Sequence, residues 1–241
     1  HRLLFWRLLR FGLPDGIQLF CDMAGFTIFV LLIGRLGTTH LAATNIVFNV
    51  NMLTFVPMMG IGIAVTVLVG QSMGKNQPDL AARAVFGAAQ LGVFYTFVMA
   101  ILFVLLPNIF IYPFAAQADP ERFEEIRTLA LFSMRFIAAF CIFDSLAIIF
   151  AAGLKGAGDT RFTMFSIIIT SLFVLVIPSY LSSTFFQAGI FVLWSIICVY
   201  IGVLCVIFIL RFLDGKWKFI RLIDKPENPE SMTIGKGLTI H

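Results

Sequence analysis

The sequence predicts an all-α, polytopic membrane protein built as a bundle of six transmembrane helices. Hydrophobic residues make up 60% of the 241 residues and charged residues only 12%, whereas charged residues average about 25% in soluble domains. The hydrophobic residues also fall into six continuous runs. Each run is long enough to cross the roughly 30 Å hydrocarbon core of a bilayer as a helix. Continuous apolar runs indicate helices because a helix satisfies its own backbone hydrogen bonds in lipid.

We expect a six-helix transmembrane lobe over residues 13–222, preceded by an interfacial segment at 1–12 and followed by a polar tail at 223–241. The interfacial segment is basic and aromatic, and the tail is rich in Pro, Gly and charged residues. Turn-forming residues fill the connectors between the apolar runs. The six helices are expected at about 13–34, 41–69, 82–106, 123–154, 161–181 and 189–213. Because the chain begins at His1 and not at Met, we expect it to be the middle of a longer protein.

The distribution of Lys and Arg predicts the orientation of the bundle. Most of these residues lie in the N-terminal segment, in the loops after the second and fourth spans, and in the C-terminal tail. The long connector on the other side is acidic. The positive-inside rule therefore places both ends of the chain in the cytoplasm. The basic residues form no patch interleaved with stacking aromatic residues, so we expect a lipid bilayer and no nucleic acid as the surroundings of this surface.

Two carboxylates interrupt the apolar spans. Asp22 lies in the first span, and Asp144 lies near the middle of the fourth. A charge at the bilayer centre costs about 2.5–3.5 kcal/mol on insertion scales and usually marks an ion or substrate pathway. Counted from the cytoplasmic side, the two side chains differ in depth by roughly 6 Å at 1.5 Å per residue, so they can share one site. The alternative is a protonated Asp that only hydrogen-bonds a neighbouring helix.

Further polar side chains accompany both carboxylates. Asp15, Gln18 and Asp22 follow the spacing i, i+3, i+7, which places them on one face of the first helix. Ser145 directly follows Asp144. We therefore interpret Gln18 and Ser145 as possible cavity-lining residues or cation ligands.

The second span combines amide side chains with a helix breaker. Asn45 and Asn49 are one turn apart, and either they bind an ion or they only form interhelical hydrogen bonds. Pro57 removes a backbone hydrogen bond, so we expect a kink there. In the third span, Gln90 and Tyr95 are expected to be packing residues.

Two carboxylates facing an apolar cavity have a defined chemistry. Burial and mutual repulsion disfavour the doubly charged form, so the pair can bind and release a proton. Oxygen ligands from Asp22, Asp144, Ser145 and an Asn can equally hold a monovalent cation. Either process lets an ion gradient change the charge of the site, which is the requirement for an ion-coupled carrier. A soluble-type catalytic triad, a P-loop and a metal-binding motif are all missing from the sequence, so we expect a transporter, not an enzyme.

One enzyme class remains as an alternative. Two membrane aspartates together with Gly156-Ala157-Gly158-Asp159 are similar to the GxGD pattern of intramembrane aspartyl proteases, in which two carboxyls share a proton. Asp159, however, falls between basic residues and outside the apolar run. We expect it to lie in a loop and to cap the next helix.

Three segments together resemble the C-terminal half of the multidrug and toxic compound extrusion (MATE) family, over Phe11 to about Leu222. The segments match the family's seventh helix, its eighth helix, and its tenth helix with the loop after it. They read FGLPDGIQLFCDMAGFTIF, LAATNIVFNVNMLTFVPMMGIGIAVTVLVGQSMG and FDSLAIIFAAGLKGAGDTR.

The resemblance implies one lobe of a twelve-helix, two-lobed exporter of drugs or toxic organic cations in a bacterial inner membrane. Export would be in exchange for Na⁺ or H⁺, with an N-terminal six-helix lobe as partner and no cofactor beyond the coupling ion. Asp22 and Asp144 match the acids of the cation site. Phe140 stands where the Na⁺-linked branch can carry a Tyr, which leaves the ion open. A lipid-linked oligosaccharide flippase of the same superfamily is the alternative, although its cleft requires basic residues.

Overall fold

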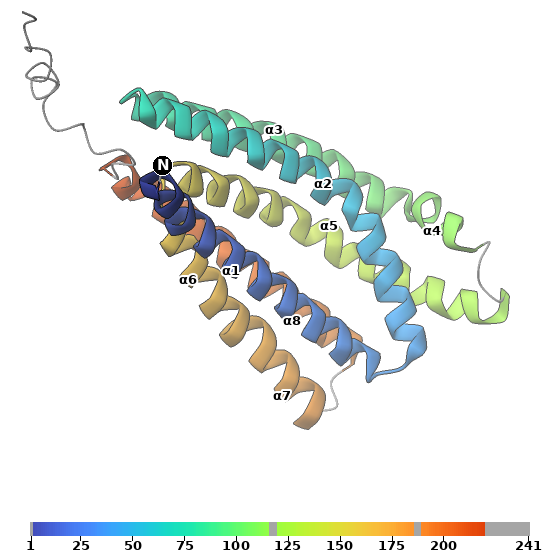
Figure 1. Cartoon of the computed structure of the whole chain (residues 1–241). Coiled ribbons are helices and arrows are strands. Elements are labelled where there is room, and N and C mark those ends of the chain that lie inside the picture. Colours follow the sequence, from blue (N-terminus) through green and yellow to red (C-terminus); the bar gives the residue numbers. More distant parts are fainter. Residues whose placement is uncertain (1, 116–119, 186–188, 220–241) are drawn as a thin grey trace, which may run out of the picture.

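The computed structural model describes residues 2–115, 120–185 and 189–219, and this part of the chain folds almost entirely into helices (Figure 1). The predicted polar tail at 223–241 lies outside the described residues. The fifth long helix changes type along its length, from α-helix to π-helix (η1) and back to α-helix. The elements are α1 (Arg2–Gly34), α2 (Thr38–Gly74), α3 (Pro78–Leu105), α4 (Pro107–Ala115), α5 (Pro120–Gly156), α6 (Thr160–Thr170), η1 (Ser171–Val176), α7 (Ile177–Phe185), α8 (Ile190–Leu213) and the 3₁₀ turn η2 (Lys216–Phe219).

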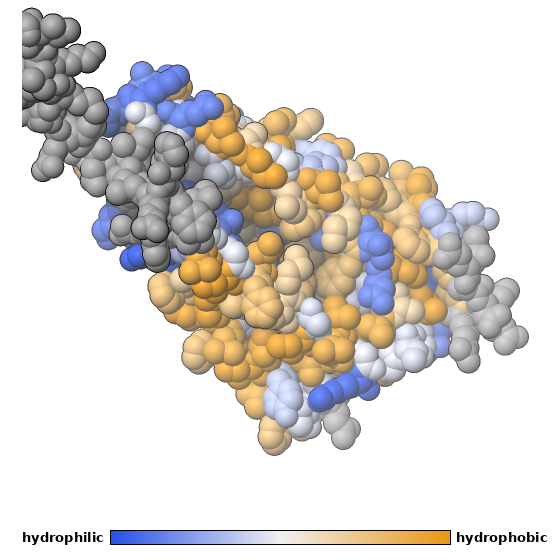
Figure 2. All heavy atoms as spheres, in the orientation of Figure 1, coloured by the Kyte–Doolittle hydropathy of each residue, from blue (hydrophilic) through white to orange (hydrophobic). Residues whose placement is uncertain are grey.

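Six helical segments are long and apolar enough to cross a membrane, which confirms the predicted all-α, multi-pass fold. They are α1 from Gly12, α2, α3, α5 from Phe123, the continuous α6–η1–α7 unit, and α8. Hydrophobic residues cover most of the visible surface between the two ends of the bundle (Figure 2). In a bilayer such a surface faces lipid or other protein, because exposing this much apolar surface to water is unfavourable.

The helices extend beyond the predicted spans. The second helix runs over Thr38–Gly74 where 41–69 was expected, and the segment at 1–12 is helical from Arg2 and continues into the first span. Hydropathy marks only the part of a helix that lies in the bilayer core, whereas backbone geometry sets where the helix ends. Left-handed residues mark the turns before α2 and after α5, at Gly37 (φ 131°) and Gly158 (φ 91°). The connector after α3 was expected to be a loop and instead contains α4.

Helix α5 is the centre of the bundle. It packs against α2, α3 and α8, whereas α1 packs mainly on α6 and η1 (Figure 1). In its most apolar stretch 67% of α5 is buried, compared with 28% for α1, α2 and α3. Asp144 therefore lies on the most enclosed span of this chain.

The α2–α5 contact depends on a small residue. A Cβ on Gly156 would lie 2.6 Å from the carbonyl oxygen of Thr66. One turn away, the Thr66 hydroxyl donates to the carbonyl oxygen of Ala152 at 3.2 Å. Small residues let membrane helices approach closely enough for such contacts.

Helix α2 bends along its length in Figure 1, and Pro57 lies inside it. A proline has no N–H, so the carbonyl of Leu53, four residues earlier, loses its intrahelical donor. The Tyr95 hydroxyl of α3 donates to that carbonyl at 2.6 Å. Tyr95 therefore joins α3 to α2 by a hydrogen bond, in addition to the packing role expected of it.

The end of the bundle where α1 begins and where α5 and α8 end is called the basic end below. There Asp159 occupies the position before α6, but its side chain makes no capping hydrogen bond, so the predicted cap is wrong. Its carboxylate instead accepts from Arg211 Nε at 2.9 Å. The Arg211 guanidinium also stacks on the ring of Phe162, 4.5 Å from the centroid. Asp159 is thus held by α8 and does not belong to a carboxyl pair with either membrane aspartate.

Candidate functional site

Asp22 is bound by a tyrosine of another helix. The Tyr200 hydroxyl of α8 donates to Asp22 Oδ1 at 3.0 Å, and Tyr200 is only 1% exposed. Sequence reasoning missed Tyr200, although its position was informative. A tyrosine in the middle of an apolar span needs a polar partner for its hydroxyl, unlike the tyrosines at the span ends.

Asp144 reaches the same region from α5. It is half-buried, and its carboxylate lies within range of electrostatic interaction with that of Asp22. Three helices that are distant in sequence therefore contribute to one polar cluster inside an apolar bundle. That the two carboxylates share one cation site stays a prediction.

The π-helical stretch η1 borders this cluster. Its first residue, Ser171, lies against Gly25 of α1, where an added Cβ would collide with the Ser171 Oγ. The Ser171 hydroxyl also lies beside that of Tyr200. Single π-turns inside α-helices often occur at functional sites. No feature of the sequence predicts this π-helix, because the apolar pattern of the fifth span continues through it.

The polar face of α1 continues toward the basic end. Gln18 is 7% exposed, and its Oε1 has no hydrogen-bond partner in the described part of the chain. Asp15 is not free, because the Lys155 ammonium of α5 lies 2.6 Å from its Oδ1. Gln18 thus offers a buried acceptor on the turn next to Asp22.

Ser145 makes its hydrogen bonds with its own helix and with α3. It is buried, its hydroxyl donates to the carbonyl oxygen of Ile142 at 2.8 Å, and it lies 3.3 Å from the Thr96 hydroxyl of α3. Consecutive helical residues point about 100° apart, so Ser145 serves the α3–α5 contact while Asp144 points elsewhere.

Asn45 and Asn49 lie on an exposed face of α2. The Asn49 side-chain amide donates to the carbonyl oxygen of Asn45 at 2.8 Å. The structure shows no contact between this pair and either carboxylate among the described residues. Their amides are available to whatever covers this face of α2.

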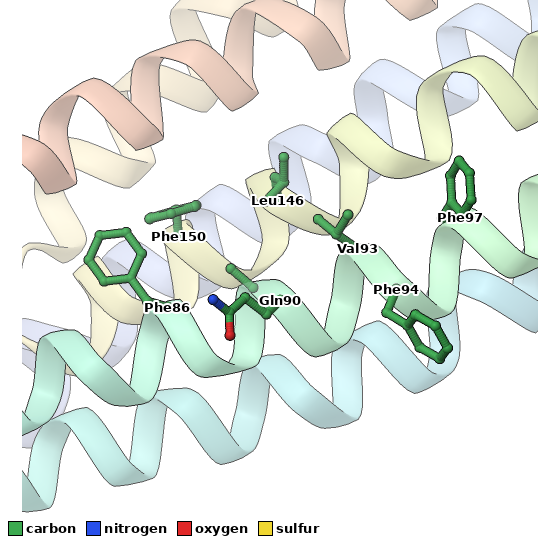
Figure 3. Close-up of a pocket in the computed structure, with 8 residues that line it drawn as sticks. Phe86, Gln90, Val93, Phe94, Phe97, Leu146 and Phe150 are labelled. Carbon is green, nitrogen blue, oxygen red and sulfur yellow. The ribbon is translucent and has the colours of Figure 1, made fainter.

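A separate apolar hollow lies between α3 and α5 (Figure 3). It measures about 570 Å³ and contains neither carboxylate. Aromatic faces attract organic cations, but the single polar lining group is the amide of Gln90. The lining residues are Phe86, Ala89, Gln90, Val93, Phe94, Phe97, Leu146 and Phe150.

The cluster of Asp22, Asp144 and Tyr200 suits a proton or a small monovalent cation. It combines two carboxylates with a phenol hydroxyl, and the neighbouring Gln18 adds an unpartnered oxygen. Oxygen donors of this kind bind hard cations, and apolar surroundings strengthen each charge interaction. Binding one positive charge would relieve the repulsion between the two carboxylates.

Comparison with protein families gives one match over most of the chain. The family model described as MatE matches residues 14–181. A probable multidrug resistance protein NorM of Brucella suis is 33% identical over 168 residues, covering 66% of this chain and 36% of that protein. The multidrug resistance protein MdtK of Proteus mirabilis is 31% identical over 173 residues, covering 72% of this chain and 36% of that protein. The chain thus aligns with about a third of the length of these curated relatives.

Solved structures match over nearly the whole chain. A crystal structure of MATE in complex with MaL6 has a TM-score of 0.81 at 17% identity and covers 91% of this chain and 49% of that one. A MOP superfamily transporter from Pyrococcus furiosus, described as having a binding pocket of reverse polarity, has a TM-score of 0.79 at 18% identity, with coverage of 88% and 47%. At these identities the likeness shows the fold. The chain corresponds to about half of each transporter.

Proposed function

This chain belongs to the MatE family, and we propose that it forms one lobe of a secondary active transporter that exports drugs or toxic organic cations in exchange for Na⁺ or H⁺. The observation that supports this function best is the pairing of Asp22 with Tyr200 close to Asp144 inside an apolar bundle. Buried charge is expensive in a membrane, and a site retained at that cost indicates an ion pathway. The names of the relatives in Brucella suis and Proteus mirabilis support multidrug resistance as the role.

Cation binding can be coupled to drug export because the proposed cation-binding residues lie on different helices. Asp22 lies on α1, Asp144 on α5 and Tyr200 on α8, so a cation bound among them favours the arrangement that brings these helices together. A bound cation shifts the balance between two arrangements only by its difference in affinity for them. An organic cation that prefers the other arrangement is then released when the coupling ion binds. Exchange requires only that the coupling ion and the organic cation prefer opposite arrangements of the helices.

The proposed setting is a bacterial inner membrane, with the basic end in the cytoplasm. Lys155, Arg211, Lys216 and Lys218 all lie at that end, as the positive-inside rule expects of cytoplasmic loops. The solved neighbours are about twice as long as this chain, so we propose a second six-helix lobe as its partner. Drug would bind between the lobes.

The test uses the full-length protein in inside-out vesicles. Ethidium uptake is followed under an imposed Na⁺ or H⁺ gradient for the wild type, for Asp144→Asn and for Glu124→Gln. Asn keeps the shape of the side chain but cannot become charged, so gradient-driven uptake should fall at least about tenfold. Glu124 pairs with Arg127 at 3.1 Å on the exposed surface away from the cluster, so its substitution should leave uptake unchanged.

Each outcome separates the candidates. Uptake that follows one gradient and is lost in Asp144→Asn supports antiport and identifies the ion. A wild type that ignores both gradients and every dye contradicts antiport and favours the flippase. Uptake by Asp144→Asn equal to that of the wild type would show that Asp144 is structural.

A further inference from the structure

Three polar residues form a line along α1 from the basic end to the carboxylate cluster. Asp15, Gln18 and Asp22 share one face of the helix, and the steps between them rise about 4.5 Å and about 6 Å along the axis. The cluster at Asp22 therefore has a polar connection toward the basic end.

Gln18 is the middle residue of this line and has an unused ligand atom. Its side chain is 7% exposed, and its buried Oε1 accepts no hydrogen bond in the described structure. A buried acceptor without a donor lowers stability compared with an apolar side chain of the same shape. A visiting cation would supply the missing partner.

The line ends at an ion pair between α1 and α5. Helix α1 packs mainly on α6 and η1, whereas α5 packs on α2, α3 and α8. The Lys155 ammonium, in the last turn of α5, crosses to Asp15 Oδ1 at 2.6 Å. A lysine is favoured there because the C-terminal end of a helix carries partial negative charge. Its charge also acts on Asp22.

We propose that the coupling cation moves between Asp22 and the basic end along α1, with Gln18 Oε1 as a transient ligand, and that the Asp15–Lys155 pair closes this path. The proposal rests on the cation-coupled antiport proposed above. Lys155 acts as a built-in cation: while it occupies Asp15, it repels another cation from the same position. Movement of α1 away from α5 separates the pair and opens the path.

The exposure of the pair fits a closure that opens in every cycle. The Asp15 side chain is 55% exposed and that of Lys155 is 24% exposed. Ion pairs with this much water contact are weak, so they close a path without locking it. A fully buried pair would instead be costly to separate.

The first experiment measures closure directly. Gln18→Cys is introduced into the full-length protein with the native cysteines replaced, in vesicles whose bath faces the basic end. The rate of labelling by a membrane-impermeant thiol reagent is compared with and without Lys155→Gln. The exchanged pair Asp15→Lys/Lys155→Asp restores the attraction, and Lys216→Gln is the matched control, because Lys216 pairs with Asp214 beyond the end of α8.

Lys155→Gln should speed labelling about fivefold, which is the factor expected when a partly exposed pair is lost. The exchanged pair should return the rate to that of the reporter alone, and Lys216→Gln should not change it. Equal rates with and without Lys155→Gln would overturn the closure.

The second experiment tests the ligand role of Gln18. Gln18→Leu should slow cation-driven ethidium exchange about tenfold, while the thermal stability of the purified protein stays equal or rises, because the unpartnered oxygen is gone. Lower stability with unchanged exchange would show that Gln18 only supports packing.

The two proposals fail separately. Labelling requires no transport, so it decides the closure even in a protein that moves no dye. A wild type that responds to neither gradient contradicts antiport. A wild type that responds to a gradient, with labelling unaffected by Lys155→Gln, contradicts the path and leaves antiport intact.

Discussion

At the scale of single residues, the Tyr200–Asp22 hydrogen bond organises the site. An ionised carboxylate has about four acceptor positions, and Tyr200 occupies one of them on Oδ1. The bond fixes the carboxylate without neutralising it, so the negative charge stays available to a cation. Tyr200 thereby adds a phenol hydroxyl from α8 to the carboxylate of α1.

Tyr200→Phe should therefore weaken the response to the coupling ion. Hydrogen bonds to charged groups contribute about 1.5–3 kcal/mol, which corresponds to roughly ten- to hundredfold in affinity. We expect the half-saturating cation concentration for ethidium exchange to rise by at least tenfold. Tyr112→Phe is the control, because Tyr112 is 78% exposed. An unchanged cation response in Tyr200→Phe would show that the hydroxyl only fills a packing position.

A site residue could be predicted from the sequence only where its residue type is energetically unfavourable in an apolar span. Asp22 and Asp144 are conspicuous because charge is rare in apolar spans. Tyr200 and Ser171 are ordinary in such spans, and their roles depend on which helices are neighbours. That information is spread over 178 positions of sequence between Asp22 and Tyr200. The rotation of α5 that turns Ser145 toward Thr96 is likewise set by packing, so the proposed ligand role of Ser145 has no support in its contacts.

At the scale of elements, the break in α2 is compensated by α3. Pro57 leaves the Leu53 carbonyl without a helical donor, and Tyr95 supplies one across the interface. The compensation stabilises the bent form of α2 and joins the two helices at that point. A bend supported from one side is a natural hinge when α3 moves.

The pairing of these two features can be measured by a double-mutant cycle. Tyr95→Phe alone should lower the free energy of unfolding by about 1–3 kcal/mol, because the carbonyl is left without a donor. With Pro57→Ala the helix regains its own N–H donor, so the same Tyr95→Phe change should cost well under 1 kcal/mol. Unfolding by denaturant in detergent micelles gives both values. Equal costs in the two backgrounds would mean that the hydroxyl does not compensate the proline.

The α2–α5 contact should be intolerant of added volume at Gly156. A methyl group there meets the Thr66 backbone at 2.6 Å and the Val69 Cβ at 2.9 Å, and backbone atoms cannot rotate away. We expect Gly156→Ala to cost about 1–3 kcal/mol as overpacking. Gly87→Ala is the matched control, because nothing lies within 4 Å of its added Cβ and Ala is the better helix former. Thermal unfolding of both variants decides, and equal midpoints would contradict the close-contact explanation.

The ends of the helices could not be predicted from hydropathy, because backbone conformation determines where each helix stops. Hydropathy located all six spans, but the helices continue past them until a residue such as Gly37, Gly158 or Asn76 (φ 58°) adopts a left-handed conformation. The π-helix of residues 171–176 has no counterpart in the apolar pattern. Its position against Gly25 results from packing between α1 and the fifth span.

At the scale of the whole molecule, the bundle consists of a central helix and two groups around it. Helix α5 holds α2 and α3 on one side and α8 on another, while α1 is carried by α6 and η1. The carboxylate cluster lies where these groups meet. Relative motion of α1 and α5 would change the distance between Asp22 and Asp144 and would also break the Asp15–Lys155 pair. Cation binding and closure of the basic end are therefore linked through one displacement.

The exposed polar groups of α2 bear on what surrounds the bundle. Asn45 and Asn49 are exposed within the second membrane span, and Asp144 is half-buried. Polar side chains inside a membrane face a protein interior or a water-filled cavity, because lipid cannot hydrogen-bond them. This face of α2 is therefore the expected side of contact with the second lobe and with the drug path.

We accordingly predict that the 241-residue chain expressed alone inserts into the membrane but does not transport. Ethidium exchange in vesicles should fall to background for the chain alone and should return when the partner lobe is expressed with it. Insertion is checked by protease protection, which distinguishes a missing lobe from a missing protein. Efflux by the chain alone would contradict the two-lobed arrangement, and the polar face of α2 would then have to be covered by a second copy of the same chain.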